Sequence, residues 1–280
     1  MQAPAALPMR VMTVGETLDA ATALLRARAL PLLSLAAVLA GVEQLVLTPM
    51  RAAAGVTAPV FLPDLDDNFG AWWLLATTGF TLETAIIAVL GAYAGAAAGP
   101  ALLGRSVRHR SLWRRTRPFP VLIVVLILAL LTWPAAFFGL LPFIFLYGLF
   151  GLATPALTLD RVGGPFRALG RSASLTVREG GRALWIRLLG YLVWFAVRFA
   201  LGTGWTAVTT MFVTTVRGDW LDYAIPVAYA LANTVAYAAL ACLDAVLLVE
   251  TRIRTEGLDI AINRRRSRGE DEAAALVVVR

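Results

Sequence analysis

The chain has 280 residues and a formal net charge of +7, with 59% apolar residues, 15% charged residues and a mean hydropathy of +0.73. A soluble domain of this length has more charge and shorter apolar runs, so the composition excludes an ordinary soluble protein. The single histidine, His109, and the single cysteine, Cys242, exclude a disulfide framework, a thiolate metal site and most histidine-dependent catalysis.

Six apolar runs are long enough to cross a bilayer, which takes about 20 residues of helix. The runs show no period-two alternation, and the bilayer core offers no water to unpaired backbone groups, so they predict helices. The expected spans lie near residues 30–47, 72–98, 121–138, 143–159, 183–213 and 224–248. We expect a break in the fifth span at Gly202-Thr203-Gly204 and a tight hairpin turn between the third and fourth spans.

A short motif occurs twice in the chain. Residues 99–106 read Gly-Pro-Ala-Leu-Leu-Gly-Arg-Ser, and residues 164–172 read Gly-Pro-Phe-Arg-Ala-Leu-Gly-Arg-Ser. Each copy follows one apolar run and precedes the next, and its proline suits the first turn of a helix, where the missing N–H costs nothing. We interpret each copy as the start of an interfacial helix that leads into a hairpin of two spans.

The N-terminal region predicts a third helix of this kind. Thr13 and Glu16 have the spacing of a capping box, and apolar residues recur behind them at helical intervals. Two interpretations stay open, an interfacial helix or an extension of the first span. With the first of these, the fold class is all-α and polytopic, with three tandem units that each contain an interfacial helix and a helical hairpin.

The basic residues are distributed unevenly along the chain. All 25 are arginine, and outside the spans nearly all lie before the first, between the second and third, between the fourth and fifth, and after the sixth. The other connections contain only Arg51 and Arg217. The positive-inside rule then places both termini in the cytoplasm. We expect residues 1–262 to form one transmembrane domain and residues 263–280 to form a mobile cytoplasmic tail.

Two of these arginine-rich stretches predict contact with lipid. We expect Arg105 and Arg108 in the first stretch, and Arg171 and Arg178 in the second, to face anionic phospholipid headgroups. Basic stretches also bind nucleic acid, but these are flanked by spans, so no nucleic-acid partner is expected. A protein partner on the same basic face stays open.

Charged residues also occur within the spans. Counting the helical rise of about 1.5 Å per residue places Glu83 and Arg198 near the midplane, and Glu43 lies in the outer part of the first span. A central charge costs at least about 2.5 kcal/mol unless it faces inward toward a partner. We predict an ion pair between Glu83 and Arg198, with Glu43 as the alternative partner. The pair would either line a polar pathway for a substrate or only hold helices together.

Glycine recurs at every fourth position near the end of the second span. Gly91, Gly95 and Gly99 leave one helix face without side chains, which predicts close approach of another helix. This contact would be either a moving one or fixed packing.

Motifs of known catalytic chemistry are absent from the sequence. It contains no Walker loop, no HExxH and no GxSxG. We therefore expect no catalytic residues, no metal site, no cofactor and no enzymatic activity.

Three segments together resemble a known family. Residues 13–19 (Thr-Val-Gly-Glu-Thr-Leu-Asp), 168–172 (Ala-Leu-Gly-Arg-Ser) and 250–258 (Glu-Thr-Arg-Ile-Arg-Thr-Glu-Gly-Leu) are similar to six-span bacterial membrane proteins related to the membrane domain of glycerophosphoryl diester phosphodiesterases. The resemblance implies the fold and a place in the bacterial cytoplasmic membrane. It does not carry over the activity, because one histidine cannot supply the histidine pair of the phosphodiesterase domain. Asp160 stands where family members often have glutamate.

The sequence favours a non-catalytic membrane scaffold or assembly partner whose basic face engages anionic phospholipid or a protein. The alternative is a transporter or permease component with a midplane polar site at Glu83 and Arg198. These functions differ in one observable feature: a transporter needs a hollow lined by those charges, whereas a scaffold is packed solid there.

Overall fold

The computed structural model describes residues 7–56, 67–212 and 221–278, and every regular element in them is helical. Asp64 and Asp66, in the connection between the first two expected spans, lie outside the described residues, as do Val213 and Arg217. The elements are α1 (Val14–Ala27), α2 (Ala29–Ala53), α3 (Phe69–Leu102), α4 (His109–Arg115), α5 (Pro118–Phe138), α6 (Leu140–Phe150), α7 (Ala153–Leu159), α8 (Pro165–Arg178), α9 (Arg182–Phe212), α10 (Leu221–Glu256), α11 (Leu258–Ser267) and the 3-10 helix η1 (Glu272–Ala275).

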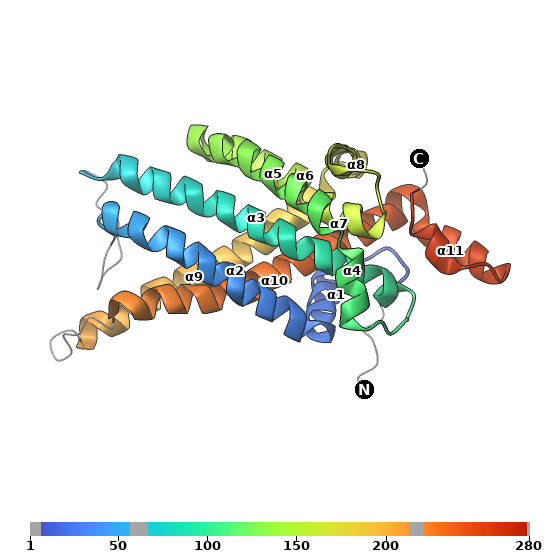
Figure 1. The fold of residues 1–280 in the computed structure, drawn as a ribbon, viewed down its shortest axis with the longest axis horizontal. Coiled ribbons are helices and arrows are strands. Elements are labelled where there is room, and N and C mark those ends of the chain that lie inside the picture. The colour runs from blue at the N-terminus through green and yellow to red at the C-terminus, as the bar shows by residue number, and fades with distance from the viewer. Residues whose placement is uncertain (1–6, 57–66, 213–220, 279–280) are drawn as a thin grey trace.

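The predicted fold class is confirmed. Within the described ranges, six helical segments are long and apolar enough to cross a membrane: α2, α3, α5, α6 with α7, the first part of α9, and most of α10. The chain is therefore an all-α, multi-pass membrane protein. Figure 1 shows these helices as one elongated bundle, with the short helices α1, α4, α8 and α11 gathered at one end.

Two spans differ from the expectation. The fourth is divided, because α6 ends at Phe150 and α7 begins at Ala153. The fifth shows no break at residues 202–204, since α9 continues to Phe212. A glycine costs a helix about 1 kcal/mol, but an interrupted helix would leave backbone N–H and C=O groups unpaired in the bilayer core, which costs more.

The capping box at the start of α1 is present. The Thr13 hydroxyl accepts from the Glu16 N–H at 3.3 Å, and Glu16 Oε2 accepts from the Thr13 N–H at 2.8 Å. The Arg10 guanidinium and these contacts hold the pKa of Glu16 at about 2, so the cap keeps its charge at any pH above that value. Arg28 leaves helical geometry, with φ −128°, so α1 is a separate helix and not an extension of the first span.

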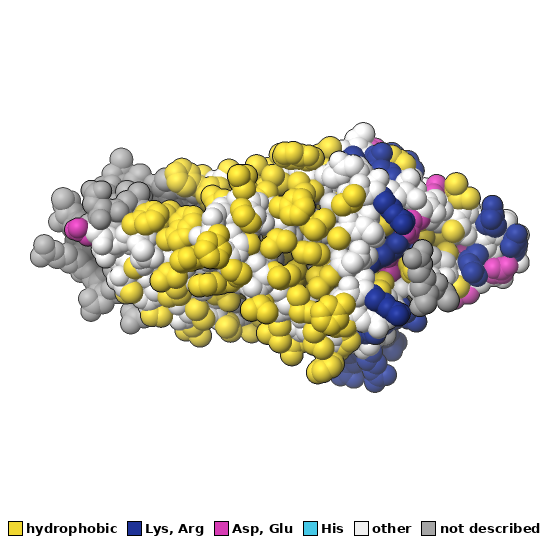
Figure 2. Space-filling model, turned by 90° about the horizontal axis from the view of Figure 1, so that it is seen from above, with side chains coloured by type: hydrophobic (Ala, Val, Ile, Leu, Met, Phe, Trp, Pro, Cys, Tyr) yellow, Lys and Arg dark blue, Asp and Glu magenta, His cyan; other side chains and the backbone are white. Residues whose placement is uncertain are grey.

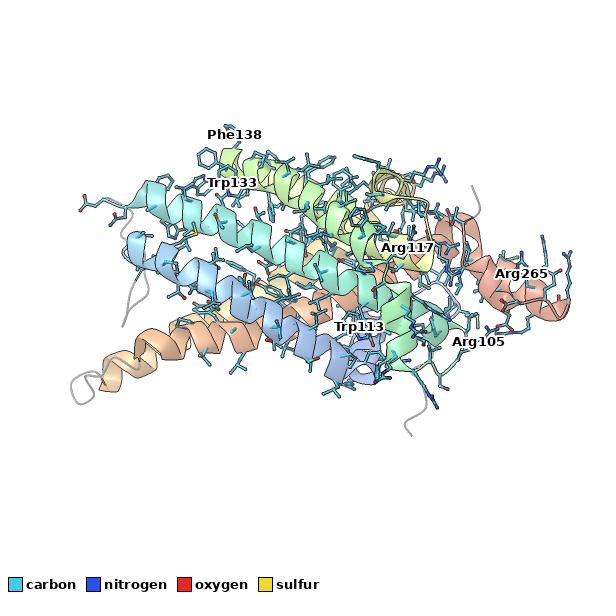
Figure 3. All side chains as sticks on the ribbon, in the orientation of Figure 1. Arg105, Trp113, Arg117, Trp133, Phe138 and Arg265 are labelled. Atoms are coloured by element: carbon cyan, nitrogen blue, oxygen red, sulfur yellow. The ribbon has the colours of Figure 1, made fainter. Side chains whose placement is uncertain are left out.

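The arginines gather at the end of the bundle that carries the short helices. Figure 2 shows a broad hydrophobic band that ends at a belt of arginine side chains. In Figure 3, Arg105, Arg117 and Arg265 lie at this end, whereas Trp133 and Phe138 lie toward the other. We call this the arginine-rich end. Such a band matches the hydrocarbon core of a bilayer, and the arginines at its edge match the headgroup region.

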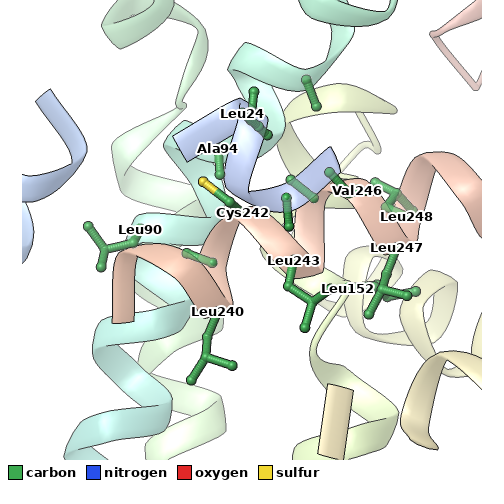
Figure 4. Packing of buried hydrophobic residues seen from close by; sticks show 14 of the residues in the cluster. Leu24, Leu90, Ala94, Leu152, Leu240, Cys242, Leu243, Val246, Leu247 and Leu248 are labelled. Atoms are coloured by element: carbon green, nitrogen blue, oxygen red, sulfur yellow. The ribbon is translucent and has the colours of Figure 1, made fainter. Parts of the chain in front are cut away.

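The core forms around α3 and α10, which are the two spans most enclosed by protein. α3 packs against α2, α5, α7 and α10, and α10 packs in addition against α1 and α9. Figure 4 shows this core, with Ala94 of α3 beside Cys242 of α10 and close to Leu24 of α1. Small residues let the helix backbones approach, as is typical inside membranes.

The glycine face of α3 meets α7. A Cβ added at Gly95 would lie 2.7 Å from Pro155 Cα, and one added at Gly91 would lie 2.8 Å from the Thr154 hydroxyl. At Gly99 it would lie 2.9 Å from a methyl group of Leu159. The predicted close approach is confirmed, and it is tightest at Gly95, where the Thr158 hydroxyl and the Pro155 backbone both lie within 2.7 Å of the added Cβ.

Gly95→Ala is expected to destabilise the bundle, because the new methyl group meets a backbone atom that cannot rotate away. Overpacking of this kind costs about 1–3 kcal/mol. Thermal unfolding of the detergent-solubilised protein measures the change. The matched control is Gly41→Ala in α2, where a Cβ meets nothing within 4 Å and the alanine should be neutral or slightly stabilising. Equal unfolding temperatures for the two variants would contradict the close contact.

The C-terminal segment packs on the bundle, whereas the sequence predicts a mobile tail from residue 263. Arg252 of α10 donates to the Leu276 carbonyl at 2.9 Å and the Ala275 carbonyl at 3.3 Å. The Val278 N–H donates to the Asp160 carbonyl at 3.0 Å, and Leu276 is 7% exposed. The polar composition of this segment predicts mobility, but its contacts with Arg252 and Asp160 hold it against the bundle.

Leu276→Asp is expected to release this segment, because it places a carboxylate in the apolar notch beside Gly99. Hydrogen exchange across residues 273–278 should become faster in the variant, with the Val278 amide as the most sensitive probe. Ile260→Asp on α11 is the control, since Ile260 is 62% exposed and should tolerate the charge. Fast exchange of residues 273–278 already in the unmodified protein would refute the docking.

Candidate functional site

A cavity of about 270 Å3 lies among α2, α3, α9 and α10, on the side away from the arginine-rich end. Figure 1 shows α9 and α10 diverging from α3 and α5 toward that side. The cavity is lined by Glu43, Gln44, Leu47, Arg51, Ala76, Gly79, Phe80, Glu83, Tyr191, Phe195, Arg198, Phe199, Tyr229, Asn233 and Tyr237. Polar and charged groups from four helices therefore converge on one hollow within the spans.

The expected ion pair between Glu83 and Arg198 is present in the cavity wall. Arg198 Nη2 lies 2.7 Å from Glu83 Oε1, which joins α9 to α3. The Tyr191 hydroxyl donates to Glu83 Oε2 at 2.9 Å. Both charged side chains are largely buried, at 13% and 5% exposed. The pair satisfies the requirement that a charge inside the membrane faces a partner.

Glu43 is not the partner of Arg198. Its carboxylate accepts from the Tyr237 hydroxyl at 2.7 Å and from the Asn233 amide at 3.0 Å. Asn233 also accepts weakly from Arg198, at 3.4 Å, and so connects the two carboxylates in one network. In the part of the chain that the structure describes, no arginine lies within salt-bridge distance of Glu43. Neutral donors hold this carboxylate in place.

Gln44 and Arg51 form the outer part of the site. Arg51 lies in the last turn of α2, and its Nη2 donates to Gln44 Oε1 at 2.7 Å. Its guanidinium carbon lies 5.5 Å from the centre of the Tyr229 ring. From the sequence, Arg51 is expected only in the connection after the first span. Its spacing of seven from Gln44, two helical turns on one face, was the signal that could have found this pair.

A second ion pair lies in the spans, outside the cavity. Arg187 Nε lies 2.6 Å from Asp244 Oδ1, and both side chains are at most 4% exposed. The guanidinium stacks over the Tyr147 ring at 3.6 Å and fills the space left by Gly151, between α6 and α7. The carboxylate partner, the ring and the glycine surround this arginine, so the pair is a packed cross-link among α6, α9 and α10.

Arg187→Met is expected to destabilise the fold by about 3–5 kcal/mol, because it leaves the Asp244 carboxylate buried without a partner. The double variant Arg187→Met with Asp244→Leu should recover most of that loss, since it removes both charges. Thermal unfolding in detergent measures both changes. If the double variant were as unstable as the single one, the ion pair would not be the source of the loss.

The four arginines expected to face lipid separate into two groups. Arg108 and Arg178 are exposed, and Arg105 is half-exposed and lies 3.2 Å from Asp271. Arg171 contradicts the expectation: its side chain is 14% exposed and pairs with Asp160 at 3.0 Å and with Glu256. Two carboxylates turn it toward the protein instead of the lipid.

Asp160 lies at the centre of a network at the arginine-rich end. It also pairs with Arg252 at 2.8 Å, and its side chain is fully buried. Burial raises the pKa of Asp160 above its usual range, although Arg252 and Arg171 oppose the shift. The arginines thus offset, without exceeding, the cost of burying this carboxylate.

Within the described residues, no group of three or more His, Cys, Asp or Glu side chains could hold a metal ion. No family model, curated protein or solved structure matches the chain.

Proposed function

We propose that the chain is a transporter or permease component that binds a small solute within the membrane, in the cavity at Glu83 and Arg198. The observation that supports this function over a solid scaffold is the hollow itself. The Arg187–Asp244 pair shows how this protein buries an ion pair by packing: the Tyr147 ring, the Gly151 notch and the carboxylate partner lie against the guanidinium, and both side chains are at most 4% exposed. The Glu83–Arg198 pair borders open volume instead.

The proposed orientation places the arginine-rich end in the cytoplasm, with both termini there, in a bacterial cytoplasmic membrane. The positive-inside rule supports this orientation. The order of elements also supports three tandem units, α1 with α2 and α3, α4 with α5 to α7, and α8 with α9 and α10. The cavity then lies toward the outer leaflet.

The basic face is proposed to engage anionic phospholipid. Exposed Arg108 and Arg178, together with Phe166, which is 75% exposed on α8, support this interaction at the lipid surface. The same surface is the support for the scaffold function as a second candidate, with a cytoplasmic protein as its partner.

Cysteine labelling tests the hollow. Ala76→Cys places a thiol in the cavity wall, and the native Cys242 is fully buried. A thiol reacts as its thiolate, which needs water. A membrane-impermeant, negatively charged methanethiosulfonate added from the outer side should therefore modify Ala76→Cys at least about tenfold faster than Leu74→Cys. Leu74 lies two residues away on the same helix and is 41% exposed outside the cavity. Equal slow rates would refute a water-filled site.

A further inference from the structure

The carboxylate and amide oxygens in the cavity already have a hydrogen-bond donor or an ion-pair partner. Both Glu43 oxygens accept hydrogen bonds, from Tyr237 and Asn233. Glu83 Oε2 accepts from Tyr191, and Glu83 Oε1 lies against Arg198. The Gln44 carbonyl oxygen accepts from Arg51. A ligand that offered only donors would find these carboxylate oxygens already engaged.

Donors in the same cavity are left over. Gln44 Nε2, Arg51 Nη1 and Arg198 Nε are buried and have no hydrogen-bond partner among the described residues. All three side chains line the cavity, and Gln44 is 6% exposed. A buried donor without an acceptor costs about 1–3 kcal/mol, so the site is complementary to a group that brings acceptors.

Arg51 brings to the cavity wall a guanidinium that has no ion-pair partner among the described residues. In the described part of the chain, no carboxylate lies within salt-bridge distance of Arg51, whose guanidinium instead packs over Tyr229. Arg198 has one carboxylate partner and a spare N–H. A guanidinium with free N–H groups in a low-dielectric site favours carboxylate or phosphate oxygens.

The rest of the cavity wall is apolar. Leu47, Phe80 and Phe195 line it from three different helices. A fully hydrated ion would gain little from these side chains, whereas a ligand with an apolar body would bury surface against them.

Resting on the proposed function, we infer that the cavity binds an amphiphilic anion. Its carboxylate or phosphate head accepts from Gln44, Arg51 and Arg198, and its apolar body lies against Leu47, Phe80 and Phe195. The leftover donors indicate a head that brings acceptors, the two guanidinium groups among them favour an anionic head, and the three apolar side chains assign the body.

Binding to the full chain in phosphatidylcholine nanodiscs tests this assignment with four probes that each contain eight carbon atoms in an unbranched chain. Octanoate and octyl phosphate carry the anionic heads, and octylammonium and octanol are the matched cation and alcohol. We expect saturable binding by titration calorimetry, and a higher unfolding temperature, with at least one anion and with neither control. Whichever anion binds more tightly identifies the head.

Gln44→Glu tests the donor directly. The substitution keeps the size and the oxygen that Arg51 uses, but replaces the leftover N–H donors with an acceptor. Octanoate or octyl phosphate should bind at least about tenfold more weakly, which is about 1.4 kcal/mol. Thr48→Glu is the matched control, because it adds the same charge one turn along α2 at an exposed position outside the cavity. Its binding should be unchanged.

The outcomes separate the two proposals. Tighter binding of octylammonium than of either anion overturns the assigned sign but leaves a solute site. No binding of any probe, with fast labelling of Ala76→Cys, overturns the amphiphilic anion and leaves a water-filled pathway. Equal loss of binding in Gln44→Glu and Thr48→Glu overturns the role of Gln44. Slow labelling of Ala76→Cys would contradict the proposed function itself.

Discussion

The structure depends on one constraint, the free-energy cost of burying a charged side chain away from water without a partner. Each deeply buried ion pair connects two spans: Arg198 with Glu83 joins α9 to α3, and Arg187 with Asp244 joins α9 to α10. At the arginine-rich end, Asp160 collects arginines from α8 and α10. An unpaired charge in hydrocarbon costs several kcal/mol, so the relative rotation of these helices is fixed by the need to keep each pair together.

The features that the sequence predicted well are those with local or one-dimensional signals. Apolar length predicts the spans, the Thr13–Glu16 spacing predicts the cap of α1, and the four-residue interval of glycines predicts a close helix contact. The expected depth of Glu83 and Arg198 in the bilayer was enough to predict their ion pair, because opposite charges at the same depth are stabilised most by pairing with each other.

The features that the sequence did not predict depend on how helices are turned about their axes. Arg171 occurs in a basic stretch, but its side chain faces Asp160 and Glu256 because of the rotation of α8. The C-terminal segment has a polar composition, and only its contacts with Arg252 and Asp160 show that it packs. Hollow and packed regions also look alike in sequence, since a neighbouring helix decides whether the space beside a glycine is filled. Arg187 fills it at Gly151, whereas Gly79 borders the cavity.

Helix α10 has a consequence for how the two ends of the molecule relate. It carries Tyr229, Asn233 and Tyr237 in the cavity wall, and it continues to Arg252, which holds the C-terminal segment. From Tyr229 to Arg252 is about 35 Å of unbroken helix, at about 1.5 Å per residue. The cavity and the arginine that holds the C-terminal segment therefore lie toward opposite ends of the same helix. A shift or tilt of α10 would move both at once.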